Sequence, residues 1–127
     1  MHSCRIHLRA ADIDALGHVN NVVFVQYLHE ARDRLLATAD SDHWHVVVAA
    51  HKITFQRPLV LGQRSVDVVT TTDRIGTASF ALHHEICAGD NVYLTAVSTL
   101  VTIEDDGPKA LTAAQRHFLE QHLSREP

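Results

Sequence analysis

Short polar breaks divide the chain into hydrophobic runs whose spacing predicts two helices and five strands. Apolar and polar positions alternate over 4–9, which indicates a first strand. A loop follows over 10–19, and Asn20 or Asn21 is a suitable N-cap for a helix that runs to about Thr38. The apolar residues of this helix recur at helical spacing, at Phe24, Tyr27, Leu28, Ala31 and Leu35.

The two halves of this helix differ in polarity. Val22, Val23 and Val25 make its first turns apolar on nearly all sides, which predicts a buried helix rather than a surface helix. The second half is expected to be more solvated because of four charged residues, Glu30, Arg32, Asp33 and Arg34.

After the polar loop 39–43 the pattern changes to that of strands. The strands are expected at 44–57, 64–73, 77–87 and 92–103, with turns at 74–76 and 88–91. A second amphipathic helix is expected over 111–123. In the first of these strands one face is expected to carry Ala49, His51, Ile53 and Phe55. His51 is the polar member of that face, and either lines a ligand pocket or is a hydrogen-bonded core histidine.

The predicted order, β-α-β-β-β-β-α, favours an α+β fold over a single domain, residues 1–127. The simplest packing wraps a curved antiparallel sheet around the apolar helix. One face or edge of so small a sheet then needs a cover, which predicts a homodimer or homotetramer.

Composition excludes several partners. The formal net charge is −4 at 127 residues, so a nucleic-acid or anionic-membrane surface is not expected. No apolar run approaches the length of a membrane span, and the N-terminus lacks a signal pattern, so we expect a cytoplasmic protein. Among 11 histidines the close pairs are His43 with His45 and His83 with His84, and neither has further ligands at a recognisable spacing. No metal site is therefore expected.

The segment 14–21, Asp-Ala-Leu-Gly-His-Val-Asn-Asn, runs into the predicted helix at 24–32. With the supporting segments 55–59 and 74–80, it resembles the hotdog-fold thioesterases of the 4-hydroxybenzoyl-CoA thioesterase type. The resemblance covers nearly the whole chain. It implies a hotdog fold and hydrolysis of acyl-CoA thioesters, with coenzyme A as part of the substrate and no separate cofactor.

The resemblance also implies site residues. Asp14 matches the catalytic carboxylate, and a backbone N–H near Asn21 matches the donor to the carbonyl oxygen, with Gly17 shaping the approach. Plant acyl-carrier-protein thioesterases resemble the same stretch, and His18 matches their histidine. Leu16 stands where they have an asparagine, so their Asp/Asn/His arrangement is not carried over, and a structural role for His18 is favoured.

The residue types suit this chemistry. A thioester carbonyl gathers negative charge, which N–H groups at a helix N-terminus can stabilise. A carboxylate can attack the carbonyl or activate a water. The alternative for Asp14 is a non-catalytic loop or capping residue. Asp12 is expected to form a turn or to be solvated. The candidates for binding coenzyme A are Arg57, Arg74, Gly76, Thr77 and Ser79, with solvated arginines as the alternative.

Three other functions stay open from the sequence. The substrate can be an acyl-carrier-protein thioester instead of an acyl-CoA. A hydratase or dehydratase can share the fold, although the chain lacks a His-Phe-Pro-Gly motif. A non-catalytic acyl-CoA binding module is the third. The resemblance further implies active sites at a subunit interface.

Overall fold

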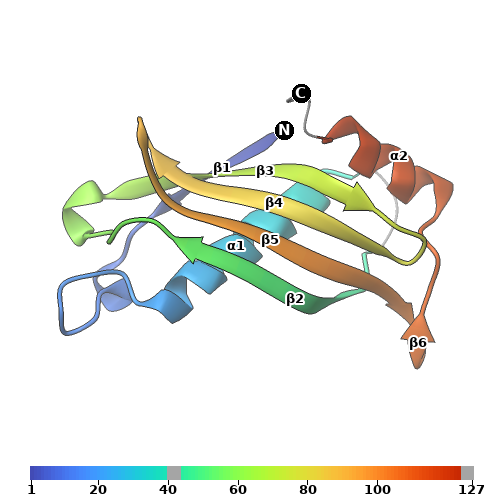
Figure 1. The fold of residues 1–127 in the computed structure, drawn as a ribbon, viewed down its shortest axis with the longest axis horizontal. Helices are drawn as coiled ribbons and strands as arrows, with labels where there is room; N and C mark the ends of the chain where they lie inside the picture. The colour runs from blue at the N-terminus through green and yellow to red at the C-terminus, as the bar shows by residue number, and fades with distance from the viewer. Residues whose placement is uncertain (40–43, 124–127) are drawn as a thin grey trace.

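A computed structural model describes residues 1–39 and 44–123. The chain forms one antiparallel sheet with a long helix against its inner face and a short helix near one end (Figure 1). In chain order the elements are β1 (His2–His7), η1 (Ala10–Asp12), α1 (Asn21–Leu36), β2 (Val46–Phe55), η2 (Leu61–Gln63), β3 (Ser65–Ile75), β4 (Ser79–Ala88), β5 (Asn91–Glu104), β6 (Gly107–Pro108) and α2 (Ala113–Gln121). The predicted α+β order is confirmed. The pattern missed η1, η2 and β6, which are too short to show a period.

The sheet has the strand order β1-β3-β4-β5-β2, with the short β6 beside β5. Neighbouring strands are antiparallel throughout, so β1 and β2 form the two edges. A β-bulge lies between Val48 and Ala50. Ala49 is therefore an extra residue and does not continue the inward alternation, whereas His51 pairs with Ser98.

The core consists of two apolar clusters on the inner face of the sheet. The larger surrounds the first half of α1 and includes Phe24, Leu28, Val68, Ile86 and Leu94. The smaller joins the end of α1 to α2 and includes Leu35, Phe80, Leu82, Leu100 and Leu119. Buried polar residues of the sheet lie alongside them, namely Thr70, Thr72, His84, Ser98 and Thr102.

The expectation that α1 is buried on nearly all sides is wrong for the single chain. Val22 is 66% exposed, because one flank of the helix is not covered by the chain itself. Conversely, Arg32 is buried and not solvated, since its position, one turn after the buried Leu28, borders the covered side of the helix. No helix of the described chain is long and apolar enough to cross a membrane.

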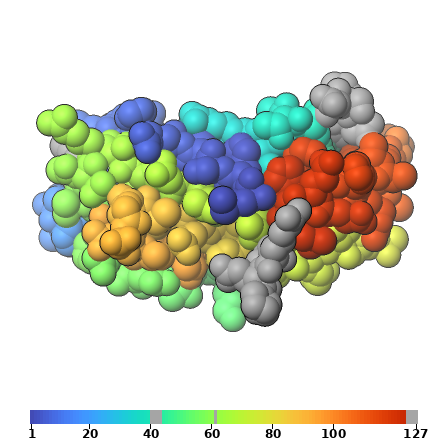
Figure 2. All heavy atoms as spheres, turned by 90° about the horizontal axis from the view of Figure 1, so that it is seen from above, coloured from blue at the N-terminus to red at the C-terminus, as the bar shows by residue number. Residues whose placement is uncertain are grey.

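The second helix covers one end of the molecule, beside the N-terminal strand (Figure 2). Thr112 caps α2 by accepting the N–H of Gln115, and Leu119 is fully buried against the sheet. The N–H of Thr72 donates to the carbonyl of His122 at 2.7 Å. The helix therefore closes the end of the sheet that lies opposite the loop 10–19.

Candidate active site

The loop between η1 and α1 folds back on itself as a small hairpin. Ile13 and Val19 form an antiparallel bridge, and the N–H of Asp14 donates to the carbonyl of His18 at 2.8 Å. The N–H of Val19 donates to the carbonyl of Leu59 at 2.7 Å, while His18 bridges to Val60. The loop is thus fixed at the end of the sheet where β2 finishes.

The carboxylate of Asp14 is oriented by this hairpin. Its Oδ1 accepts the N–H groups of Leu16 at 2.9 Å and of His18 at 3.3 Å. Within the described chain its Oδ2 accepts no hydrogen bond. Gly17 makes the turn possible at a φ of 83°, a region that favours glycine. One carboxylate oxygen is therefore held, and the other is available to a substrate or a water.

The first turn of α1 offers one backbone donor. Asn20 is the N-cap, and its Oδ1 accepts the N–H of Val22 at 2.9 Å. The N–H groups of Val23 and Phe24 donate to the carbonyl of Asn20. The N–H of Asn21 has no acceptor among the described residues. It points out of the positive end of the helix dipole, where it can bind a partially negative oxygen.

The two aspartates of the loop have different environments. Asp12 is buried, and its carboxylate accepts the hydroxyl of Tyr27 at 2.6 Å and two N–H groups of Arg9 at 3.0 and 3.2 Å. Burial alone would raise the pKa of Asp12, but the bonds from Tyr27 and Arg9 outweigh it and lower the pKa. Asp12 forms a turn, as the sequence suggested, but it is not solvated. It anchors the loop to α1, a role that the sequence pattern did not reveal.

Several expected residues take other places. The backbone of His18 supports the hairpin, as described above. Glu30 pairs with Arg34, one helical turn farther along α1, at 3.1 Å. His51 shares a 2.7 Å hydrogen bond between its Nδ1 and the hydroxyl of Ser98, and it remains exposed in the single chain.

The candidate residues for coenzyme A fall into two groups within one chain. Arg57 follows β2 and donates to the Oδ1 of Asn91 at 2.7 Å, at the same end of the sheet as the loop. The other four lie in or beside the β3–β4 turn at the opposite end, namely Arg74, Gly76, Thr77 and Ser79. A Cβ at Gly76 would lie 2.9 Å from the Oγ of Ser79 and 3.1 Å from its carbonyl oxygen, so the turn is tightly packed at this position. One chain therefore does not bring the two groups together.

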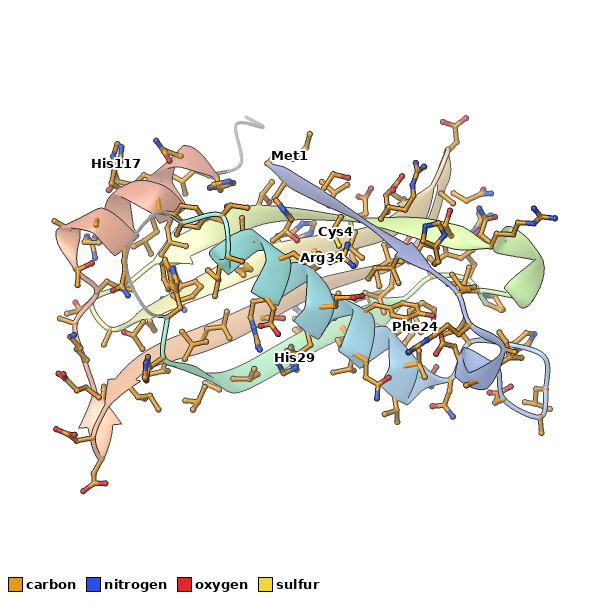
Figure 3. The ribbon with its side chains drawn as sticks, turned by 180° about the vertical axis from the view of Figure 1, so that it is seen from behind. Met1, Cys4, Phe24, His29, Arg34 and His117 are labelled. Carbon is orange, nitrogen blue, oxygen red and sulfur yellow. The ribbon has the colours of Figure 1, made fainter. Side chains whose placement is uncertain are left out.

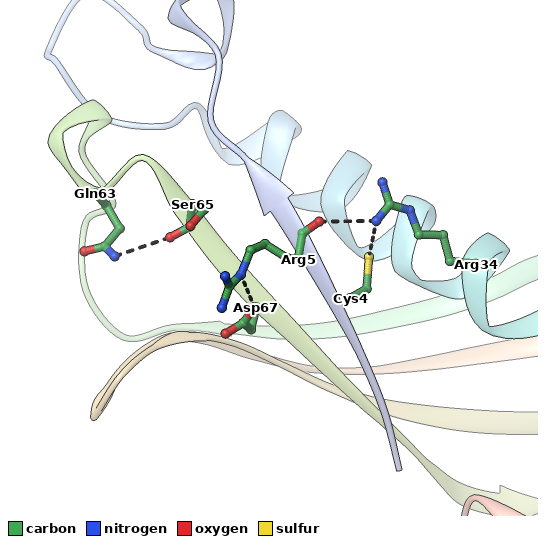
Figure 4. A network of polar contacts seen from close by, with 6 residues as sticks. All are labelled: Cys4, Arg5, Arg34, Gln63, Ser65 and Asp67. Atoms are coloured by element: carbon green, nitrogen blue, oxygen red, sulfur yellow. Dashed lines mark hydrogen bonds and ion pairs between the residues drawn. The ribbon is translucent and has the colours of Figure 1, made fainter.

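An open depression of about 810 Å³ lies between β1 and α1. The three arginines that line it are all paired: Arg5 with Asp67, Arg9 with Asp12 and Arg34 with Glu30. Arg34 also contacts the Sγ of Cys4 and the carbonyl of Arg5 (Figure 4). None of the residues expected in the active site lines this depression. It is not the candidate active site.

Metal-ligating side chains do not gather in the described parts of the chain, where no three His, Cys, Asp or Glu residues are placed to hold an ion. His43, one member of an expected pair, lies outside the described residues. His83 and His84 point to opposite faces of β4, as the alternation of a strand requires.

Comparison with known proteins gives one consistent answer. A family model for the thioesterase-like superfamily matches residues 8–121. A thioesterase from Thermus thermophilus, solved with coenzyme A and zinc, shares 31% identity and a TM-score of 0.88 over 98% of this chain and 96% of its own. A candidate acyl-CoA thioesterase from Xanthomonas campestris shares 29% identity and a TM-score of 0.77 over 87% and 98%. No curated protein matches the chain.

A third solved structure agrees with these. A probable thioesterase from Escherichia coli shares 27% identity and a TM-score of 0.81 over 96% of this chain and 98% of its own. The superfamily match covers most of the chain, and it includes the loop, the helix that the loop caps and all but the first strand of the main sheet. The chain therefore belongs to the thioesterase-like superfamily and is a thioester hydrolase of the hotdog fold.

Proposed function

We propose that the chain hydrolyses acyl-CoA thioesters with Asp14 as the reacting carboxylate and the N–H of Asn21 as the donor to the carbonyl oxygen. The observation that carries the proposal is the pairing of an oriented carboxylate with an unused helix N-terminal donor on one short loop. Gly17 and His18 shape that loop through their backbones.

Thioester hydrolysis requires a donor to the carbonyl oxygen and a nucleophile or base, and Asn21 and Asp14 would supply them. The N–H of Asn21 and the positive end of α1 stabilise the negative charge on the carbonyl oxygen. The free Oδ2 of Asp14 either attacks the carbonyl, giving a mixed anhydride that water opens, or removes a proton from the attacking water. Label found in Asp14 after a single turnover in isotopically labelled water would establish the anhydride route, because the general-base route places the label only in the released acid.

The test is release of free thiol from a panel of acyl-CoA and acyl-carrier-protein thioesters. Asp14→Asn should lower kcat by roughly a hundredfold to ten-thousandfold, the range for losing a general base. Asp73→Asn, an exposed aspartate of β3, is the matched control and should leave kcat unchanged. If Asp14→Asn and Asp14→Ala retain wild-type turnover of every hydrolysed thioester, the assignment fails. Binding without thiol release would favour a binding module, and hydration of an enoyl thioester would favour a hydratase.

The exposed edge of β2 supports a homodimer as the working unit. This strand of ten residues pairs with β5 on one side only, and Val47, Val48 and Phe55 are exposed on it. An uncovered apolar edge strand is a template for a second copy of the chain. Antiparallel pairing of two β2 strands about a twofold axis would extend the sheet across both copies.

Such a dimer would also bring the two groups of residues proposed to bind coenzyme A to the same end of the sheet. Because the two β2 strands would run in opposite directions, the β3–β4 turn of the second copy would lie at the same end as Asp14 and Arg57 of the first. Arg57 would then approach the substrate nucleotide from one copy, and Arg74, Gly76, Thr77 and Ser79 from the other. Light scattering should report a dimer or a tetramer, and Val47→Lys with Val48→Lys should give a monomer with reduced turnover. A wild-type monomer with full activity would refute this arrangement.

A further inference from the structure

One flank of α1 faces the uncovered inner side of β2. Val22, Val25, His29 and Arg32 follow one another at spacings of three and four residues, so they form one stripe along the helix. The opposite flank faces β1, where Arg34 contacts Cys4. Figure 3 shows this division, with Arg34 on the β1 side of the helix and His29 on the side nearer β2.

The character of this space changes along the helix. Near the start of α1 it is apolar: the ring of Phe55 packs on that of Phe24 at 5.8 Å between centroids, and Ile53 packs against the larger core cluster. Farther along, the inward-facing residue of β2 is His51, and the helix presents His29 and Arg32. These two lie about 12 and 16 Å from Asn21 along the helix axis.

Nitrogen-bearing side chains from three elements lie on the inner side of the sheet beside the second half of α1. Arg32 of α1 is 8% exposed, His84 of β4 is 1% exposed, and His51 extends from β2. The pKa of His84 is lowered to about 4 by burial first and then by the charges of His83, His51 and Arg32. The pKa of His51 is lowered by burial, Arg32 and His29. The charge of Arg32 therefore opposes protonation of both histidines.

The described chain does not supply each of these nitrogen groups with a buried hydrogen-bond acceptor. Arg32 has one carboxylate partner, Asp33, at 3.3 and 3.4 Å, and that side chain is 65% exposed on the solvent side. The Nδ1 of His84 bonds to the hydroxyl of Thr70 at 2.9 Å, while its buried Nε2 has no partner. A buried polar atom without a partner is destabilising. Among the described residues the cluster therefore has no buried carboxylate to neutralise Arg32.

We propose that Arg32 and His51 bind a carboxylate at the far end of the acyl group, so that the enzyme prefers thioesters of dicarboxylic acids to those of simple fatty acids. This rests on the active site proposed at Asp14. The apolar start of the space takes the carbon chain, and the guanidinium of Arg32 neutralises the terminal carboxylate. In the tautomer of His84 that accepts the Thr70 hydroxyl at Nδ1, the buried Nε2 carries a hydrogen and is a further donor.

The experiment compares matched pairs of substrates: adipoyl- and hexanoyl-CoA, suberoyl- and octanoyl-CoA, and sebacoyl- and decanoyl-CoA. Wild type should show a higher kcat/KM for the dicarboxylic member at one or more lengths. Arg32→Gln should lower kcat/KM for that member by roughly ten- to a hundredfold, the usual range for a charged hydrogen bond, and leave its partner nearly unchanged. Arg32→Lys should recover part of the loss. Arg34→Gln is the matched control, because its guanidinium faces β1, and it should not change the preference.

Two outcomes would overturn the proposal. One is equal or lower kcat/KM for the dicarboxylic member of every pair while the simple acyl-CoA esters are hydrolysed. The other is an Arg32→Gln variant that loses both substrates equally and also changes its mass in light scattering, which would assign Arg32 to a subunit contact. His51→Gln, at an exposed position, repeats the comparison should Arg32→Gln unfold. Failure to release thiol from any substrate would instead refute the proposed function.

Discussion

The hydrogen bond between Tyr27 and Asp12 should be the strongest single link between the active-site loop and α1. The perturbation is Tyr27→Phe, which removes the donor and leaves the ring in place. The bond is 2.6 Å long, and both residues are 3% exposed. A hydrogen bond to a charged group contributes about 1.5–3 kcal/mol, and we expect a loss of about 2 kcal/mol because Arg9 still donates to the carboxylate.

The pH dependence provides a second readout. Since the pKa of Asp12 is lowered in the folded protein, its contribution to stability is full above the unfolded value of about 3.9 and is lost as the pH falls through the folded pKa. Without the hydroxyl of Tyr27, the folded pKa should rise. The penalty of Tyr27→Phe should therefore be large near pH 7 and smaller below about pH 4.

The assay is urea unfolding of wild type and variant over this pH range. Tyr93→Phe is the matched control, because the hydroxyl of Tyr93 donates to the neutral Oε1 of Gln63 at 3.2 Å, a bond of about 1 kcal/mol. The reasoning is refuted if Tyr27→Phe destabilises no more than Tyr93→Phe near pH 7, or if its penalty is the same at low pH.

Three further predictions concern the loop and the core. Asn20→Ala should lower the free energy of unfolding by about 1 kcal/mol through loss of the helix cap. Asn20→Asp should retain most of the wild-type stability in the same urea titration, because aspartate can also cap the helix. Gly17→Ala should cost about 1 kcal/mol and reduce kcat because φ is 83°, whereas Gly62→Ala, which meets no atom within 4 Å and has no positive φ, should do neither. The pKa of His84 is about 4 when folded and about 6.5 when unfolded, so the unfolded state binds more protons between these values and wild type loses stability as the pH falls through them. His84→Gln should flatten this slope, and an unchanged slope beside the control His83→Gln would contradict the assignment.

The sequence by itself determined the elements and the local geometry of the loop. Periods of two and of 3.6 residues are local properties, so the strands and both helices were predicted to within a few residues of their ends. The cap at Asn20 and the turn at Gly17 likewise depend on neighbouring residues alone. The resemblance of the loop to the thioesterases then selected the fold and the class of reaction, and the superfamily match agrees with both.

Only the tertiary structure decided what each charged or apolar group touches. Asp12 is buried because α1 brings Tyr27 to it, fifteen residues away in sequence. Val22 and Arg32 lie on the same flank of α1, yet Val22 is exposed and Arg32 is buried, because Arg32 lies nearer to the side of the helix that packs on the sheet. Arg57 and Arg74 are separated because the C-terminal end of β2 and the β3–β4 turn lie at opposite ends of the sheet. Burial and proximity depend on how distant segments pack, and a local pattern carries no information about that.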